Sequence, residues 1–361
     1  MPVAFLTRHR RLQLGLFGML AGAAAGIAGG SQASAAAQVA VWIRGELTVI
    51  VDDVTTVGCN ASGGITFNGA ALSPSIACAA ILELTLVPAA EFGADMTVDV
   101  RAVTSAKFPA LRAGLATRLQ FGTRKAIVYG SPLVDVISVG TGGKAYGRSG
   151  NDVVLAAKRS ANTELWGGEG DDFLAVDGPL SSRLEGGPGN DVLENMGGTG
   201  SMIGGDGDDI LSGASANVSM FGGGGNDVIN AQPTDIALAR IIDGGPGVDR
   251  LSAIANGLRL TATSSSGAQP TIRITSSEFG RLDAVRFEQV SLTGVDSQRI
   301  GITMDPLVTY EVTQPGLPGY RLVVTVPAGS WTIAGNTVTA AGFGSVTWAN
   351  TTTVVVRGAI S

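Results

Sequence analysis

The sequence predicts an all-β protein whose middle part is a solenoid of parallel strands, closed by a β cap at each end. Three observations predict this fold. A glycine-rich nonapeptide recurs at a nearly constant interval along the middle of the chain, and such an interval is typical of a solenoid. Both flanks contain short alternating or apolar runs rich in Val, Thr and Ile, as strands do. The amino-terminal flank shows no helical period of useful length.

Each nonapeptide carries an aspartate at its sixth position, and the best copies have glycine at the first, second and fourth. The best copies begin at Gly167, Gly186, Gly204 and Gly222, and weaker copies begin at Gly130, Gly147 and Gly244. Successive aspartates are 17 to 22 residues apart. The seven aspartates are Asp135, Asp152, Asp172, Asp191, Asp209, Asp227 and Asp249.

The residue types of the nonapeptide indicate a calcium site. Glycines permit positive φ and close approach of neighbouring backbones, so that carbonyl oxygens can converge beside the carboxylate. Calcium takes six to eight oxygen ligands in flexible geometry, whereas magnesium demands a smaller octahedron. The candidate ligands are the aspartates Asp152, Asp172, Asp191, Asp209, Asp227 and Asp249, together with the glycines Gly168, Gly170, Gly187, Gly189, Gly205, Gly207, Gly223 and Gly225. Asp135 is the weakest candidate, because Leu133 replaces a turn glycine and would crowd an ion.

This pattern resembles the haemolysin-type (RTX) calcium-binding repeat, G-G-x-G-x-D-x-U-x with U apolar. The resemblance implies a tight turn that holds calcium, followed by a short strand whose apolar eighth residue faces the core, and coils of two nonapeptides, about 18 residues. The start of the chain (GELTVIV, ITFNGA, FPAL, then VYGSPLVD) also resembles secreted bacterial proteins of this type. The good copies recur once per coil, so they all fall on one side. The intervening nonapeptides have Gly200 and Val218 where aspartate belongs. We therefore expect one calcium-loaded edge and one metal-free edge.

Metal binding is expected to be coupled to folding. Adjacent parallel strands lie about 4.8 Å apart, and carboxylates stacked at that rise repel by roughly 3 kcal/mol per pair at an effective dielectric near 20. Calcium between them would convert repulsion into bridging. The loops from Asp152 to Asp227 predict about four sites between coils, with Asp249 completing a fifth.

The ends of the chain predict an exported protein. Residues 1–35 have a basic start, an apolar stretch and a small-residue cleavage site at Ala33–Ala35, as a signal peptide does; a retained membrane anchor is the alternative. Cleavage would move the net charge from −6 to −9, because three arginines leave. A secreted or cell-surface location, no nucleic-acid partner and no membrane insertion after cleavage follow as expectations. The two cysteines, Cys59 and Cys78, are expected to form a disulfide.

The expected function is a non-enzymatic one, structural or adhesive, with calcium ions as partners and cell-surface polysaccharide or matrix as a further candidate. The sole histidine, His9, lies in the predicted signal, which excludes histidine-dependent zinc, triad and dyad chemistry after cleavage. One alternative is a calcium-dependent polysaccharide lyase or epimerase, with Lys144, Arg148 or Lys158 as base. Another is a glycan-binding module, whose platform would consist of Tyr310, Tyr320, Trp331 and Trp348.

Four segments follow from these patterns: the signal at 1–35, an amino-terminal β region at 36–125, the calcium-binding roll at 126–252 and a carboxy-terminal β cap at 253–361. We interpret the amino-terminal region as degenerate coils of the solenoid or as a β cap. The carboxy-terminal cap reads as metal-free coils or a small sandwich. Strand candidates in the flanks include Val39–Val51, Val285–Leu292 and Trp331–Val338.

Overall fold

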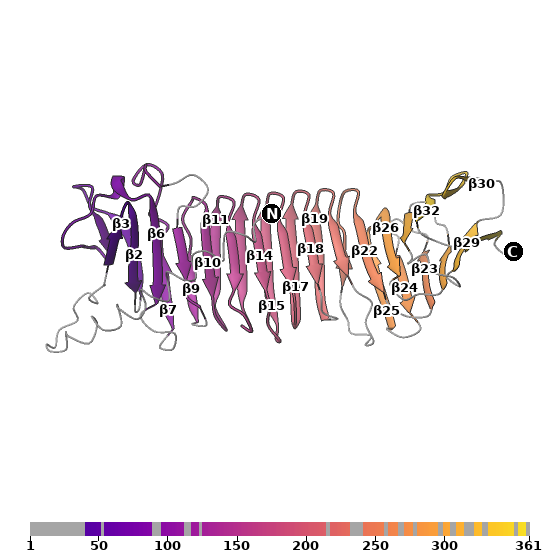
Figure 1. Cartoon of the computed structure of the whole chain (residues 1–361), viewed down its shortest axis with the longest axis horizontal. Helices are drawn as coiled ribbons and strands as arrows, with labels where there is room; N and C mark the ends of the chain where they lie inside the picture. Colours follow the sequence, from indigo (N-terminus) through magenta and orange to yellow (C-terminus); the bar gives the residue numbers. More distant parts are fainter. Residues whose placement is uncertain are drawn as a thin grey trace.

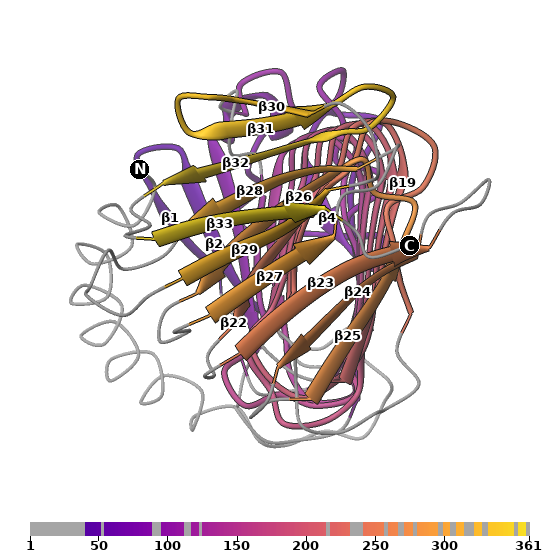
Figure 2. The same ribbon diagram turned by 90° about the vertical axis from the view of Figure 1, so that its right-hand side faces the viewer.

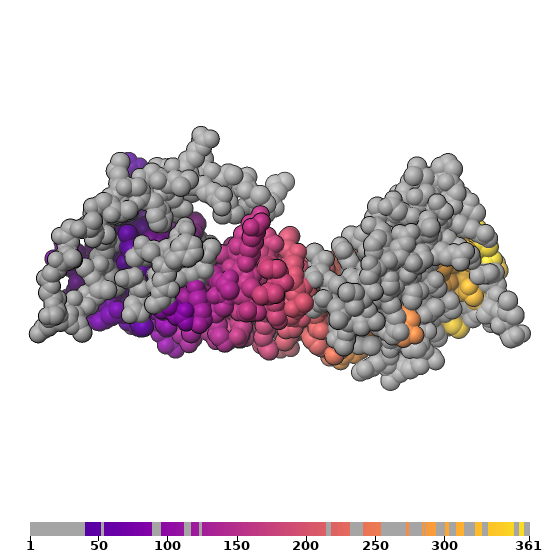
Figure 3. Space-filling view, turned by 90° about the horizontal axis from the view of Figure 1, so that it is seen from below, coloured from indigo at the N-terminus to yellow at the C-terminus, as the bar shows by residue number. Residues whose placement is uncertain are grey.

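The protein is an elongated solenoid of short strands stacked along its long axis (Figure 1). The computed structural model describes residues 40–51, 54–88, 95–111, 117–122, 125–213, 217–231, 241–255, 259–265, 271–276, 280–294, 299–303, 308–313, 321–326, 331–349 and 353–358. The predicted signal lies outside the described residues. Seen from below, the colours of the sequence succeed one another along the body, so that chain order and spatial order agree (Figure 3). Within the described part of the chain, no helix is long and apolar enough to cross a membrane.

One face of the solenoid is a 16-stranded sheet, called sheet A here. Its strands from β2 to β32 pair in parallel, each with the strand one coil away. One antiparallel strand, β1, is added at the amino-terminal end, and two, β31 and β30, are added at the carboxy-terminal end. In spatial order the strands are β1 (Ala40–Ile43), β2 (Glu46–Val51), β6 (Glu83–Pro88), β8 (Thr117–Gln120), β10 (Asp135–Val139), β12 (Val153–Ala156), β14 (Phe173–Val176), β16 (Val192–Asn195), β18 (Ile210–Gly213), β20 (Val228–Ala231), β22 (Arg250–Ala255), β26 (Gln289–Gly294), β28 (Thr309–Thr313), β32 (Ser345–Ala349), β31 (Thr337–Ala340) and β30 (Trp331–Ala334).

The opposite face, sheet B, is formed by the strands that alternate with these along the chain. Its parallel pairing is interrupted once, where β25, β24 and β23 form an antiparallel meander between β21 and β27. The strands in spatial order are β3 (Thr55–Cys59), β7 (Met96–Asp99), β9 (Ala126–Tyr129), β11 (Lys144–Ser149), β13 (Glu164–Glu169), β15 (Ser182–Pro188), β17 (Thr199–Asp206), β19 (Asn217–Gly224), β21 (Ile242–Asp243), β25 (Gly280–Val285), β24 (Thr271–Ser276), β23 (Arg259–Ser265), β27 (Arg299–Thr303), β29 (Arg321–Val326) and β33 (Thr353–Gly358).

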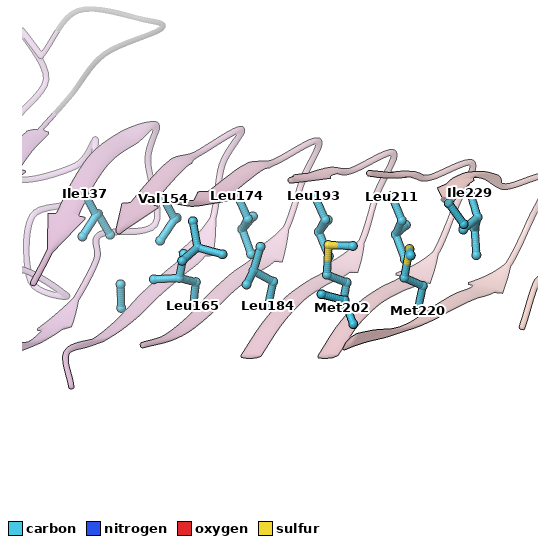
Figure 4. Close-up of a cluster of buried hydrophobic side chains, with 14 of the residues drawn as sticks. Ile137, Val154, Leu165, Leu174, Leu184, Leu193, Met202, Leu211, Met220 and Ile229 are labelled. Carbon is cyan, nitrogen blue, oxygen red and sulfur yellow. The ribbon is translucent and has the colours of Figure 1, made fainter. Parts of the chain in front are cut away.

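The core is a double row of apolar side chains between the two sheets (Figure 4). Sheet A contributes the eighth residue of each nonapeptide, and sheet B contributes one residue per coil from the facing strand. None of these side chains is more than 1 % exposed, and burial of each contributes about 1.5–3 kcal/mol. The sheet A row is Ile137, Val154, Leu174, Leu193, Leu211, Ile229 and Leu251, and the sheet B row includes Leu165, Leu184, Met202, Met220 and Ile242.

The amino-terminal region consists of coils of the same solenoid, extended by local hairpins. Strands β4 (Ile65–Phe67) and β5 (Ala70–Ala71) and a single 3-10 turn (Cys78–Ala80) fill its end. The predicted disulfide between Cys59 and Cys78 is present. The run from Val39 to Val51 is not one strand, because Arg44 and Gly45 adopt φ values of 52° and 89° and turn the chain into the β1–β2 hairpin.

The carboxy-terminal region continues both sheets as coils, and Figure 2 looks onto this end. Two predicted strands are wrong in extent. Val285–Leu292 is broken at Arg286, whose φ is 57°, and the two pieces belong to opposite sheets, as β25 and β26. Trp331–Val338 is a hairpin that reverses at Gly335 (φ 58°), so that β30 and β31 cap the end of sheet A.

Candidate metal centre

The aspartates of the nonapeptides lie in the turns that carry the chain from sheet B to sheet A. Asp172 lies between β13 and β14, Asp191 between β15 and β16, and Asp209 between β17 and β18. The same turn recurs in each coil, so all seven aspartates stack along one edge of the solenoid. Each is at most 2 % exposed. Among the described residues, the opposite edge carries no row of buried carboxylates.

One carboxylate oxygen of each aspartate is used to hold neighbouring coils together. The backbone N–H of Asp172 donates to Oδ1 of Asp191, and the N–H of Asp191 donates to Oδ1 of Asp209. The same bond joins every consecutive pair from Asp135 to Asp249, at 2.7–2.9 Å. Hydrogen bonds to a charged acceptor are stronger than those between neutral groups, so this ladder fixes the direction of each carboxylate.

The second oxygen, Oδ2, is buried and has no hydrogen-bond partner among the described residues. This holds for the six predicted ligand aspartates: Asp152, Asp172, Asp191, Asp209, Asp227 and Asp249. Leaving a buried polar atom unsatisfied costs about 1–3 kcal/mol, and more if it is charged. A row of six such atoms therefore offers ligands to a bound cation.

Each Oδ2 points at the first glycine of its own nonapeptide. A Cβ placed on Gly186 would lie closer than 3.0 Å to Oδ2 of Asp191 and to the carbonyl oxygen of Gly204, which is the first glycine of the next coil. The arrangement recurs in every coil, at the glycines Gly147, Gly167, Gly186, Gly204 and Gly222. A carboxylate oxygen and a carbonyl oxygen thus converge in the space that a side chain would fill. The first glycines thus join the second and fourth glycines that the sequence predicts as site residues.

The second and fourth glycines, which the sequence predicts as site residues, have a left-handed backbone. Gly187 and Gly189 have φ values of 122° and 138°, and side chains would strain there. Their neighbours are also backbone: a Cβ on Gly189 would collide with the carbonyl oxygen of Gly170 one coil earlier. The same is true of Gly168, Gly170, Gly205, Gly207, Gly223 and Gly225.

A second ladder of hydrogen bonds, which the nonapeptide motif does not predict, runs along the fifth positions. Oδ1 of Asp171 accepts the N–H of Asn190, Oδ1 of Asn190 accepts that of Asp208, and Oδ1 of Asp208 accepts that of Asn226, at 2.7–2.8 Å. In this ladder each side chain accepts a hydrogen bond from the backbone N–H of the following coil. In the sixth-position ladder each aspartate accepts one from the backbone N–H of the preceding coil. The alternation of Asn and Asp at position five was visible in the sequence. It keeps like charges two coils apart on this exposed strip.

Burial raises the pKa of the stacked aspartates. The pKa rises to about 7 for Asp172 and Asp209 and to about 9 for Asp152, chiefly because desolvation disfavours the charged form. The backbone N–H donor of the neighbouring coil lowers each pKa in part, and neighbouring carboxylates raise it further. Removal from water is thus the larger cause of the raised pKa, and the repulsion expected between neighbouring carboxylates adds to it.

The row is closed at its amino-terminal end by hydroxyl groups. Asp135 accepts Oγ1–H of Thr117 (2.5 Å), the backbone N–H of Ser131 (2.6 Å) and the hydroxyl of Ser131 (2.9 Å). Both of its carboxylate oxygens are therefore satisfied by the protein. Asp135 stays the weakest candidate ligand, because protein donors bind both of its carboxylate oxygens in addition to the crowding expected from Leu133.

The donor set of the edge suits a hard cation. Each space between successive turns offers carboxylate and carbonyl oxygens. In the described part of the chain, no three His, Cys, Asp or Glu side chains are grouped so that they could hold a metal ion by themselves. Calcium accepts mixed carboxylate and backbone oxygens in flexible geometry, whereas zinc prefers histidine and cysteine. The buried, unpaired Oδ2 atoms fit this chemistry.

Fold and edge together define a parallel β-roll whose turns are built to hold cations. The model of the RTX calcium-binding nonapeptide repeat matches residues 203–232 in four copies. Residues 203–232 therefore carry RTX-type calcium-binding repeats, and this match supports an RTX-type calcium-binding repeat protein. No curated protein and no solved structure matches the chain significantly.

The first glycine of a nonapeptide is expected to be essential for the site. Gly222→Ala would push a methyl group against Oδ2 of Asp227 and the carbonyl of Gly244, and overpacking of this kind costs about 1–3 kcal/mol. We expect a lower melting temperature in calcium and the loss of one bound ion by native mass spectrometry. Gly224→Ala is the matched control, because its Cβ meets only Oδ1 of Asp206 at 3.5 Å. Equal behaviour of the two variants would refute the assignment.

Proposed function

We propose that the protein is a secreted, non-enzymatic calcium-binding β-roll with a structural or adhesive role, in which metal binding is coupled to folding of the roll. The observation that carries this proposal is the row of buried Oδ2 atoms facing carbonyl oxygens. Within the nonapeptides it predicts five ions, one between each successive pair from Asp152 to Asp249. The calcium supplies positive charge between coils. The chain holds Oδ2 in place through the N–H···Oδ1 ladder and keeps the space open with glycine.

Several features support an extracellular setting. The predicted signal at 1–35 and the disulfide between Cys59 and Cys78 both favour an oxidising compartment outside the cytosol. Ion sites made from one carboxylate and backbone oxygens per coil suit an environment in which calcium is abundant. The net negative charge of the chain also disfavours nucleic acid as a partner. Cell-surface polysaccharide or matrix remains the partner class that we propose.

The lyase alternative gains no support from the three candidate bases. Lys144 lies on the outer face of sheet B with Nζ 2.7 Å from Oε1 of Glu164, and this hydrogen bond raises the pKa of the lysine. A base needs the opposite shift. Arg148 belongs to the calcium edge, whereas Lys158 is exposed in the β12–β13 connection at the opposite edge. The three are therefore not gathered into one site.

The glycan-platform alternative is also weakened. Tyr310 is fully buried, Trp331 is 39 % exposed, and Tyr320 lies outside the described residues. A different aromatic row lies outside sheet B: Tyr146 stacks on Tyr129 at 5.1 Å and on Trp166 at 4.4 Å between ring centroids. Because these rings cover one another's faces, little aromatic face is left for a sugar.

Calcium titration of the mature chain tests the proposal. We expect heat uptake or release with a stoichiometry of at least five ions by isothermal titration, and a calcium-dependent gain of β signal in circular dichroism at pH 8. A mature protein that is fully β without calcium at that pH and unchanged by millimolar calcium would contradict it. Uronic-acid polymers are expected to yield no unsaturated product, whose absorbance would instead support a lyase.

A further inference from the structure

The carboxylate ladder does not end with the last nonapeptide. The backbone N–H of Asp249 donates to Oε2 of Glu288 at 2.8 Å, as each earlier aspartate N–H donates to the next aspartate. The backbone keeps the same register, because the N–H of Gln289 donates to the carbonyl of Asp249 at 3.0 Å, just as Arg250 donates to Asp227. Glu288 thus occupies the place of the next aspartate, although it belongs to no nonapeptide.

The sequence distance of 39 residues between Asp249 and Glu288 is explained by the meander. After β22 the chain forms β23, β24 and β25, and β25 returns to the side of β21 in sheet B. The short turn at Arg286–Glu288 then leads into β26, which pairs with β22 in sheet A. The turn that carries Glu288 is therefore the direct spatial successor of the turn that carries Asp249.

The space between the Asp249 turn and the Glu288 turn is lined by the same kinds of oxygen atoms as the spaces between successive nonapeptide turns. Oδ2 of Asp249 has no hydrogen-bond partner among the described residues, and the side chain is 0 % exposed. A Cβ on Gly244 would lie closer than 3.0 Å to this atom and to the carbonyl oxygen of Arg286. The carbonyl of Arg286 thus takes the place that the first glycine of the next coil has elsewhere.

The net charge at this place is suited to one divalent cation. The guanidinium of Arg286 is bound to both oxygens of Asp243 at 2.5 Å, so these two charges cancel each other. Asp249 and Glu288 then carry two negative charges between them. The buried carboxylate of Asp249 is costly without a counter-ion, and the half-buried carboxylate of Glu288 adds a second negative charge beside it.

We propose that Asp249, the carbonyl of Arg286 and Glu288 form a further calcium site that joins the roll to the carboxy-terminal region. This inference rests on the proposed function, because it assumes that the other intervals bind calcium. As a consequence, the last ion would bind the turn that contains Arg286 and Glu288, which lies outside the nonapeptides, to the last nonapeptide turn. Calcium would then order the β25–β26 turn as well as the repeat turns.

The variant Glu288→Gln tests the site. Glutamine keeps an oxygen for the N–H of Asp249 but removes the charge. Native mass spectrometry of the calcium-loaded mature chain is expected to count six ions in the unaltered protein and five in the variant. Glu311→Gln is the matched control, because Glu311 lies in the neighbouring coil in an exposed ion pair with Arg250; it is expected to retain six.

The outcomes separate this inference from the proposed function. Five ions in both the unaltered protein and Glu288→Gln would overturn the inference and leave the proposed function intact, whereas no bound calcium at all would overturn the proposed function. A measurement on the unaltered protein guards against a variant that does not fold. Hydrogen exchange of β25 and β26 is expected to slow on calcium addition, together with the repeat turns. Exchange in these strands that calcium leaves unchanged would refute the site.

Discussion

The double variant Asp191→Asn, Asp209→Asn is expected to be more heat-stable than the unaltered protein without calcium at pH 8, and less stable in calcium. In the absence of metal, asparagine retains the Oδ1 acceptor of the ladder. Its Nδ2–H₂ faces the carbonyl oxygens of Gly204 and Gly222, which lie beside the original Oδ2 atoms. A buried charge without a partner is thereby replaced by a satisfied donor. In calcium, the same change removes two anionic ligands.

Thermal melting with and without calcium measures this reversal. We expect the melting temperature of the double variant to be several degrees higher than that of the unaltered protein without calcium, and several degrees lower in calcium. Asp208→Asn is the matched control, because Asp208 is the exposed neighbour of Asp209 and its Oδ1 bond to Asn226 survives in asparagine. Exposed substitutions of this kind usually change stability by no more than about 0.5 kcal/mol. A double variant that is destabilised equally in both solvents would show that the carboxylates have an ordinary structural role.

The calcium-free protein is expected to lose stability as pH rises from about 4 to about 9. Unfolded aspartates have a pKa near 4, whereas burial raises it to about 6 for Asp191, about 7 for Asp172 and about 9 for Asp152. The metal-free fold therefore binds more protons than the unfolded chain in this window, so its stability is greatest near pH 4 and falls as each folded pKa is passed. A rise from about 4 to about 7 corresponds to about 4 kcal/mol for one group.

Because several aspartates share this behaviour, the total approaches the whole stability of a typical domain, about 5–15 kcal/mol. In calcium the dependence is expected to reverse, since bound carboxylates are ionised and protons compete with the metal as pH falls. Melting temperatures of metal-stripped and calcium-loaded protein should thus diverge as pH increases. Stripped protein is preferable to a chelator, whose own affinity depends on pH. Parallel curves for the two forms would contradict this linkage.

The roll itself could be predicted from the sequence, because the residues that define each coil lie within one nonapeptide. Glycine, aspartate and an apolar eighth residue recur in phase, and this phase places Asp172 on the edge and Leu174 in the core. The sequence alone does not separate the structural roles of these glycines, because the residue type is the same at each position. Gly187 is needed for its φ of 122°, whereas Gly186 is needed for the space beside Oδ2 of Asp191.

The two ends of the carboxylate row could not be predicted, because their partners come from distant segments. Asp135 is satisfied in part by Thr117, 18 residues earlier, whose hydroxyl marks no motif. Glu288 joins the ladder only because a three-stranded meander interrupts the repeat and returns the chain to the same edge. In both cases the pairing of strands, which tertiary packing decides, selects the residue.

A crystal structure of the calcium-loaded protein with anomalous data tests the central claim most directly. We predict anomalous peaks in a single row along the aspartate edge, one in each interval beside the Oδ2 atoms of Asp152, Asp172, Asp191, Asp209, Asp227 and Asp249, and none beside Asp135. An edge without such peaks in crystals grown with millimolar calcium, with the Oδ2 atoms bonded to protein groups instead, would contradict it.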